Sequence, residues 1–165
     1  MRLRTAAFLA MLLPCLLGGC VERSGSELDL SSATLLSRDK HGDLNKAVFS
    51  FEHGHRDEAL AGNDWDVEFG NGGDGFNVTM ATDDRSRIRD LGWMQWSGLD
   101  LATLPHLPAH PEPAREPQAK AFQGHIYMVH TKDENSDLHV LFRVEKLFPG
   151  DRAELSWAKV EAPGK

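Results

Sequence analysis

Alternating apolar and polar side chains recur between residues 46 and 160 and predict short β-strands. The clearest case is DWDVEFG at 64–70, where Trp65, Val67 and Phe69 alternate with acidic residues. A period of two is typical of a strand with one buried face and one solvated face. Similar short patterns occur in AVFSFEHG at 47–54, FNVTMAT at 76–82 and RIRDLGWMQW at 87–96.

Three further strand-like runs fill the C-terminal part of the chain. They are GHIYMVHT at 124–131, DLHVLFRVEKL at 137–147 and AELSWAKVE at 153–161. The polar segment KDENS separates the first two runs and the turn-forming segment FPGD separates the last two, so antiparallel hairpins are expected. No stretch has a sustained helical periodicity. The sequence therefore predicts an all-β fold, an antiparallel sandwich or open barrel of about seven or eight strands.

Composition divides the chain into segments. Residues 1–19 predict a signal peptide, and residues 20–43, rich in Ser, Asp, Glu and Lys, predict a flexible tether. A single β domain is expected over 44–160, followed by a short tail at 161–165. Within the domain, the segment 104–118 contains five prolines. Proline cannot donate to a β ladder, so this segment is expected to cross the surface in an extended conformation.

The N-terminus has a different pattern, in which two arginines precede an apolar run that ends at Leu17. This run is shorter than the roughly 20 residues that span a bilayer as a helix. Leu17-Gly18-Gly19-Cys20 resembles the lipobox of bacterial lipoproteins. The resemblance implies cleavage before Cys20 and lipidation of Cys20 with palmitate-type acyl chains, which would anchor the protein to a membrane. Val21 stands where an aspartate signals inner-membrane retention, which favours the outer membrane.

Cleavage before Cys20 would remove 19 of the 165 residues, including two arginines and no acidic residue, so the net charge would change from −7 to −9. This acidity argues against nucleic acid or an anionic membrane surface as a partner. The remaining length suits one domain with a core. Because Cys15 would leave with the signal peptide and Cys20 would be acylated, the mature chain is expected to lack disulfides, a cysteine nucleophile and thiolate metal sites.

The C-terminal hairpin contains the leading candidate site. If its loop is centred between Glu134 and Asn135, Val129 faces Val140 on one side, and His130 faces His139 on the other side. Directly opposed side chains have Cβ atoms about 4.5–5.5 Å apart, so His130 and His139 could share a divalent metal or contribute to a haem site. A shift of one residue would destroy this pairing, and two histidines are fewer than a closed metal site needs. The simpler interpretation is that both are solvent-facing strand residues.

Other candidate groups have simpler structural explanations. His53 and His55 are two apart, as in some metal sites, but Gly54 between them is more typical of a strand end. Asp66 and Glu68 could serve an unidentified hydrolase, although acidic residues on one strand face are usually solvated. Trp93 and Trp96 could line a platform for a sugar or another ligand, or fill the core. His106 and His110 lie in the proline-rich segment, and no known nucleophile, phosphate-loop or zinc-protease motif occurs.

The strands also resemble a family. WDVEF at 65–69, the Asn/Gly-rich turn after it and the closing hairpins from 124 to 157 are similar to the HmuY-like haem-binding lipoproteins. The resemblance covers about 47–158 and implies a lipid-anchored all-β protein. The sequence departs from the family at the turn 133–137 and in its proline-rich insertion, and no haem ligand of the family can be assigned to a particular histidine.

Together these features predict a lipid-anchored protein of the bacterial envelope that faces the periplasm or the outer surface. We expect its β domain to be a non-enzymatic binding or interaction module for a small ligand or an envelope protein. Two alternatives remain: a haem-binding or metal-binding lipoprotein that uses surface histidines, and an unidentified hydrolase. The leading expectation includes no cofactor, and haem or a divalent metal belongs to the first alternative.

Overall fold

The structure, a computed structural model, describes residues 28–54, 65–78, 86–106, 117–132 and 136–162. The predicted signal peptide, the lipidation site Cys20 and most of the proline-rich segment, including His110, lie outside the described residues, as does His55. Among the helices of the described part, none is long and apolar enough to cross a membrane.

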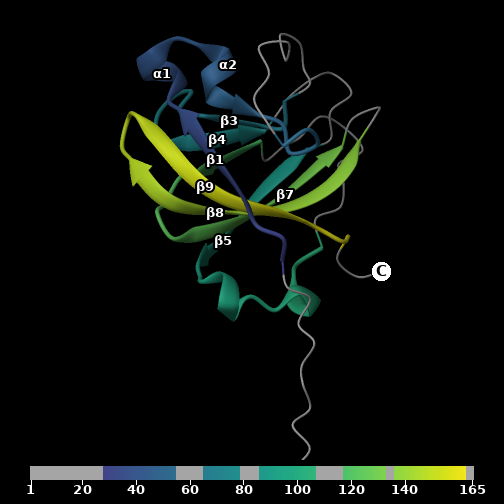
Figure 1. Cartoon of the computed structure of the whole chain (residues 1–165). Helices are drawn as coiled ribbons and strands as arrows, with labels where there is room; N and C mark the ends of the chain where they lie inside the picture. Colours follow the sequence, from purple (N-terminus) through teal and green to yellow (C-terminus); the bar gives the residue numbers. More distant parts are fainter. Residues whose placement is uncertain (1–27, 55–64, 79–85, 107–116, 133–135, 163–165) are drawn as a thin grey trace, which may run out of the picture.

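Nine strands lie within the described ranges and form two antiparallel sheets that pack face to face (Figure 1). The five-stranded sheet contains, in spatial order, β1 (Ser31–Leu36), β9 (Arg152–Val160), β8 (Asp137–Phe148), β7 (His125–Lys132) and β5 (Arg87–Trp93). The four-stranded sheet contains β2 (Val48–Phe49), β3 (Val67–Phe69), β4 (Gly75–Val78) and β6 (Gln118–Lys120). The prediction of an all-β antiparallel fold is confirmed, and its form is a sandwich without a closed barrel.

The main core lies between the two sheets and is rich in aromatic side chains. Tyr127 of β7 stacks on Phe142 of β8 with ring centroids 4.9 Å apart, and Phe76 of β4 meets Phe142 edge-on, also at 4.9 Å. Aromatic pairs in these geometries stabilise a core beyond the burial of their area. The Tyr127 hydroxyl is satisfied within the protein, because it donates to the Lys120 carbonyl at 2.8 Å and accepts from the Phe122 amide at 2.9 Å. This contact joins the end of β6 to β7.

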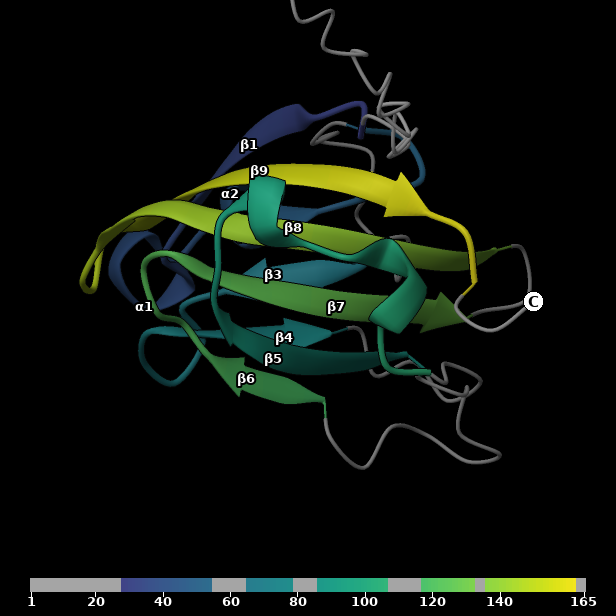
Figure 2. The ribbon, with the colours of Figure 1, turned by 90° about the horizontal axis from the view of Figure 1, so that it is seen from below.

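The opposite, outer face of the five-stranded sheet is also covered. Residues 94–104, which include the 3₁₀ helices η1 (Trp96–Gly98) and η2 (Leu101–Thr103), cross over β7, β8 and β9 (Figure 2). Their apolar side chains pack on a second cluster formed by Ile126, Met128 and Leu141, which are fully buried. The central strands are therefore buried on both faces, and their sequences read as almost continuous apolar runs.

The flexible tether predicted for 20–43 is wrong from Ser31 onward. Ser31–Leu36 forms β1, which pairs with β9 at the edge of the larger sheet, and Leu35 is fully buried. Two short helices follow, α1 (Arg38–His41) and α2 (Leu44–Ala47). The polar composition concealed this strand, since only one face of an edge strand enters the core.

The acidic residues around β3 are buried, in contrast to the solvated face that alternation predicts. Asp66 is 6 % exposed, and its Oδ2 accepts from the amide of Phe51 at 2.6 Å and from the hydroxyl of Ser50 at 3.4 Å. Glu68 is 3 % exposed and accepts from Arg38 of α1 at 2.9 Å and from Asn71 at 3.0 Å. Each carboxylate therefore ties together segments that are distant in sequence.

Asp66 makes the stability of the fold depend on pH. Burial raises the pKa of its carboxyl from 3.8 to about 6, against the opposing effect of the Phe51 amide. The folded protein thus binds the Asp66 proton more tightly than the unfolded chain. The stabilisation that comes from this tighter proton binding at Asp66 is fully present below about pH 4 and is lost as the pH rises through about 6.

We expect Asp66→Asn to stabilise the protein at pH 7 and to have little effect at pH 4. The amide removes the ionisation that opposes folding, and a shift of about two pH units corresponds to about 3 kcal/mol. Chemical unfolding at several values between pH 4 and pH 7, with the exposed Asp29→Asn as a matched control, measures this effect. A stability difference that stays constant over this pH range would contradict the prediction.

Candidate metal centre

The β7–β8 hairpin brings four polar side chains together near its turn. His130 pairs with His139 in the strand register, and Lys132 pairs with Asp137 two positions further along. Because side chains two apart in a strand point to the same face, all four lie on the outer face of the five-stranded sheet. The predicted pairings of His130 with His139 and of Val129 with Val140 are both confirmed.

The two imidazoles are in direct contact. Their ring centroids lie 4.0 Å apart and the ring planes are inclined by 22°. His130 is 5 % exposed and His139 is 8 % exposed. The expectation that these were solvent-facing surface histidines is therefore wrong. The two rings cover each other, and Arg87 and Val160 flank them on the neighbouring strands. A pattern read along one strand does not reveal these contacts between strands.

Asp137 completes the cluster. The ring Nε2 of His130 donates to its Oδ1 at 2.8 Å, and the ammonium of Lys132 binds its Oδ2. These contacts, with that of Lys132 the strongest, hold the pKa of the Asp137 carboxyl below its usual range. The side chain of Asp137 is 51 % exposed, so the cluster is closed on the imidazole side and open to solvent on the carboxylate side.

His130, Asp137 and His139 offer one ligand atom each, and these atoms lie within 4.8 Å of one another. No other group of three such side chains among the described residues comes as close. Bonds of about 2.0–2.1 Å to zinc would draw the donors closer together. Asp137 can supply this movement, because it is the first residue of β8 and exposed.

Two imidazoles and one carboxylate are a donor set typical of zinc and the later first-row transition metals. With three protein ligands, one or more coordination positions would remain for water or another ligand. Asp137 was not predicted as a ligand. The signal for it was the Asp-x-His spacing of Asp137 and His139, since a strand places residues two apart on one face.

Positive charge also surrounds the cluster. Lys132 already holds one oxygen of Asp137, and Arg87 of β5 lies opposite His130 in the register on the other side of β7. The positive charges of Lys132 and Arg87 lower the affinity of the cluster for a divalent ion. The negative charge of the Asp137 carboxylate compensates for one of these two charges. A metal ion would therefore compete with the Lys132 ammonium for Asp137.

The other predicted candidates do not assemble into a site among the described residues. His53 is exposed in the turn after β2, and His106 is exposed beyond η2. Asp66 and Glu68 are held by the structural hydrogen bonds given above. The two tryptophans differ: Trp96 is packed on the outer face and donates to the Ser156 hydroxyl at 2.8 Å, whereas Trp93 is 67 % exposed.

Comparison with known proteins adds no assignment to this site. The chain matches no protein-family model, no curated protein and no solved structure. The resemblances described from the sequence stay predictions, and the case for a metal rests on the geometry of the hairpin.

Proposed function

We propose that the chain is a lipid-anchored protein of the bacterial cell envelope whose β domain binds a transition-metal ion rather than catalysing a reaction. The observation that carries the binding role is the meeting of His130, His139 and Asp137 at one end of the β7–β8 hairpin. Strands at the centre of a sheet hold such side chains more precisely than a loop does.

The donor set favours zinc, nickel, copper or cobalt over calcium and magnesium. Imidazole nitrogen suits the later transition metals, whereas calcium and magnesium prefer sites made only of oxygen. A bare ion also suits the geometry better than haem does. Haem iron bound by two histidines needs their nitrogens on opposite sides of the porphyrin, and rings stacked at 4.0 Å leave no room for it between them.

The anchor is supported by the sequence alone. The apolar run before Leu17-Gly18-Gly19-Cys20 has the length of a signal peptide, and acyl chains on Cys20 would hold the domain at the membrane. Val21 supports the outer membrane as the location. Non-enzymatic function is supported by the structural use of Asp66 and Glu68, the carboxylates that the hydrolase hypothesis requires.

We expect the full chain, purified in detergent, to bind Zn²⁺ and Co²⁺ through this cluster. His130→Ala and His139→Ala should each weaken binding by about 100-fold or more, because loss of a ligand costs at least as much as loss of a group that supports a ligand. Calorimetry with Zn²⁺ and the visible absorption of bound Co²⁺ provide the measurements. The exposed His106→Ala is the matched control and should bind as the wild type does; equal binding by all the variants would refute the assignment.

Removal of the competing ammonium should strengthen the site. We expect Lys132→Gln to raise Zn²⁺ affinity by about tenfold, which corresponds to about 1.4 kcal/mol, because Asp137 is then free to turn toward the ion. Lys146→Gln, which removes a lysine paired with Glu154 instead, should leave the affinity unchanged. A weaker affinity in Lys132→Gln would show that the lysine supports the site rather than opposing the metal.

The anchor is tested separately from the metal. We expect Cys20→Ser to move the protein from the membrane fraction to the soluble fraction, because the acylated sulfur is lost. Cys15→Ser is the matched control and should stay with the membrane, since Cys15 lies within the predicted signal peptide. Fractionation of cells that express each variant gives the answer, and a membrane-bound Cys20→Ser would count against the lipobox.

A further inference from the structure

A second part of the surface, far from the hairpin turn, exposes aromatic rings. Trp93 at the end of β5 is 67 % exposed, and Phe122 between β6 and β7 is 41 % exposed. Within the described ranges, Leu30 is the only other large apolar side chain as open to solvent. The ends of β5 and β6 lie at the same end of the sandwich (Figure 2). Exposed aromatic residues that gather in one place commonly mark a binding surface.

Direct contacts link these two rings through Gly124 and His125. Trp93 pairs with His125 in the register, and its indole lies so close to Gly124 that a Cβ there would come within 2.7 Å of the ring. Phe122 contacts the His125 ring with centroids 4.9 Å apart, and Asp90 holds His125 Nδ1 at 2.9 Å. Trp93, Gly124, His125 and Phe122 therefore form a continuous strip, the aromatic strip.

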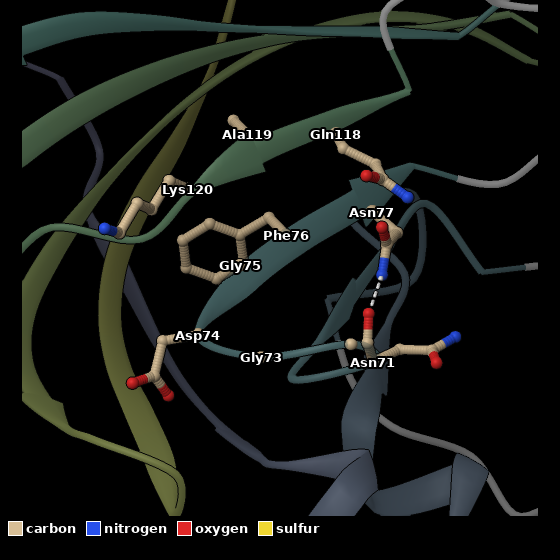
Figure 3. Close-up of a pocket in the computed structure, with 10 residues that line it drawn as sticks. Asn71, Gly73, Asp74, Gly75, Phe76, Asn77, Gln118, Ala119 and Lys120 are labelled. Carbon is tan, nitrogen blue, oxygen red and sulfur yellow. Dashed lines mark hydrogen bonds between the residues drawn. The ribbon is translucent and has the colours of Figure 1, made fainter.

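A polar pocket adjoins this strip through one shared residue. The pocket has a volume of about 390 Å³ and is formed by the glycine-rich turn before β4, by β4 itself and by β6 (Figure 3). Lys120 lines the pocket, and its ammonium also lies 5.3 Å from the centroid of the Phe122 ring. The strip and the pocket thus meet at the end of β6.

Amide groups dominate the polar lining of the pocket. Asn77 and Gln118 are paired neighbours on β4 and β6, and Asn77 donates to the carbonyl of Asn71 at 3.5 Å (Figure 3). Each side-chain amide can both donate and accept hydrogen bonds. We name the group formed by Asn71, Asn77, Gln118 and Lys120 the amide pocket.

The turn that forms one wall of the amide pocket is held in place from outside. The carboxylate of Asp39 in α1 accepts from the amides of Gly72 and Gly73 at 2.9 and 2.8 Å. Both glycines have positive φ, of 86° and 111°, which residues with a side chain rarely adopt. This wall is therefore fixed before any ligand arrives, which lowers the ordering cost of binding.

This surface has no excess of positive charge. Asp74 and Lys120 both line the amide pocket, and Asp90 is paired with His125 beside the strip. A surface without excess positive charge does not favour a phosphate or a nucleotide. Exposed ring faces beside amide donors and acceptors instead match a ligand that has apolar C–H faces and many hydroxyl groups.

We infer that the aromatic strip and the amide pocket together bind an oligosaccharide. One sugar face would stack on Trp93 or Phe122 through its C–H groups, and the hydroxyls of a sugar further along the oligosaccharide would bond to Asn77 and Gln118. The pocket lies within the range of about 300–1,000 Å³ that small-ligand sites occupy. This inference goes beyond the proposed metal binding and uses none of its residues.

The test uses two phosphate-free glycans of the bacterial envelope, peptidoglycan glycan strands and O-polysaccharide released from lipid A and its phosphorylated core, which share this chemistry but come from different sources. The full chain in detergent is measured for binding to each immobilised glycan by an optical biosensor. We expect one of the two to bind, and Trp93→Ala and Phe122→Ala each to lower its affinity by about tenfold or more, as for aromatic residues central to an interface. Trp93→Phe should retain most of the affinity, because it keeps a ring face.

Three controls make the result decisive. Leu30→Ala removes an exposed apolar side chain elsewhere and should not change binding, and circular dichroism confirms that each variant is folded. Excess chelator should not change binding either, which separates this site from the metal centre. The inference is overturned if neither glycan binds, or if the bound glycan is held equally well by Trp93→Ala and Phe122→Ala.

Discussion

The register of β7 against β8 is the constraint on which both the core and the candidate metal centre depend. Val129 lies opposite Val140 on the inner face, and one position further His130 lies opposite His139 on the outer face. A slip of one strand by one residue would turn its side chains to the opposite face and move its imidazole into the aromatic core. Tyr127 stacks on Phe142 of β8 inside the core that the smaller sheet closes. This contact therefore specifies the register. The same packing determines where the histidines meet.

The cover on the outer face determines what the histidine pair can do. On the outer face, the pair His130–His139 is the next pair after Met128–Leu141. Met128 and Leu141 are buried under residues 94–104. The imidazoles thus stand at the border between an apolar cluster and the solvent that reaches Asp137. Ligands held by packing on one side and open on the other are preorganised and accessible, which is the arrangement that a reversible metal site needs.

Local alternation was sufficient to predict most of the strands and the C-terminal hairpin, because a period of two is imposed by each strand itself. It failed where burial depends on a distant segment. Glu68 is buried because Arg38 reaches it from α1, thirty residues earlier, and no pattern within β3 reports that contact. The burial of His130 also depends on other strands, since His139 of β8 and Arg87 of β5 flank it. The strand at Ser31–Leu36 was missed because its polar outer residues, at the edge of a sheet, resemble those of a tether.

The two proposed sites belong to one strand and yet are structurally independent. His125 begins β7 and belongs to the aromatic strip, whereas His130 lies five residues further, about 17 Å along an extended strand. A separation of five positions, which is odd, also places the two side chains on opposite faces of the sheet. A ligand at one end therefore touches no side chain of the other site.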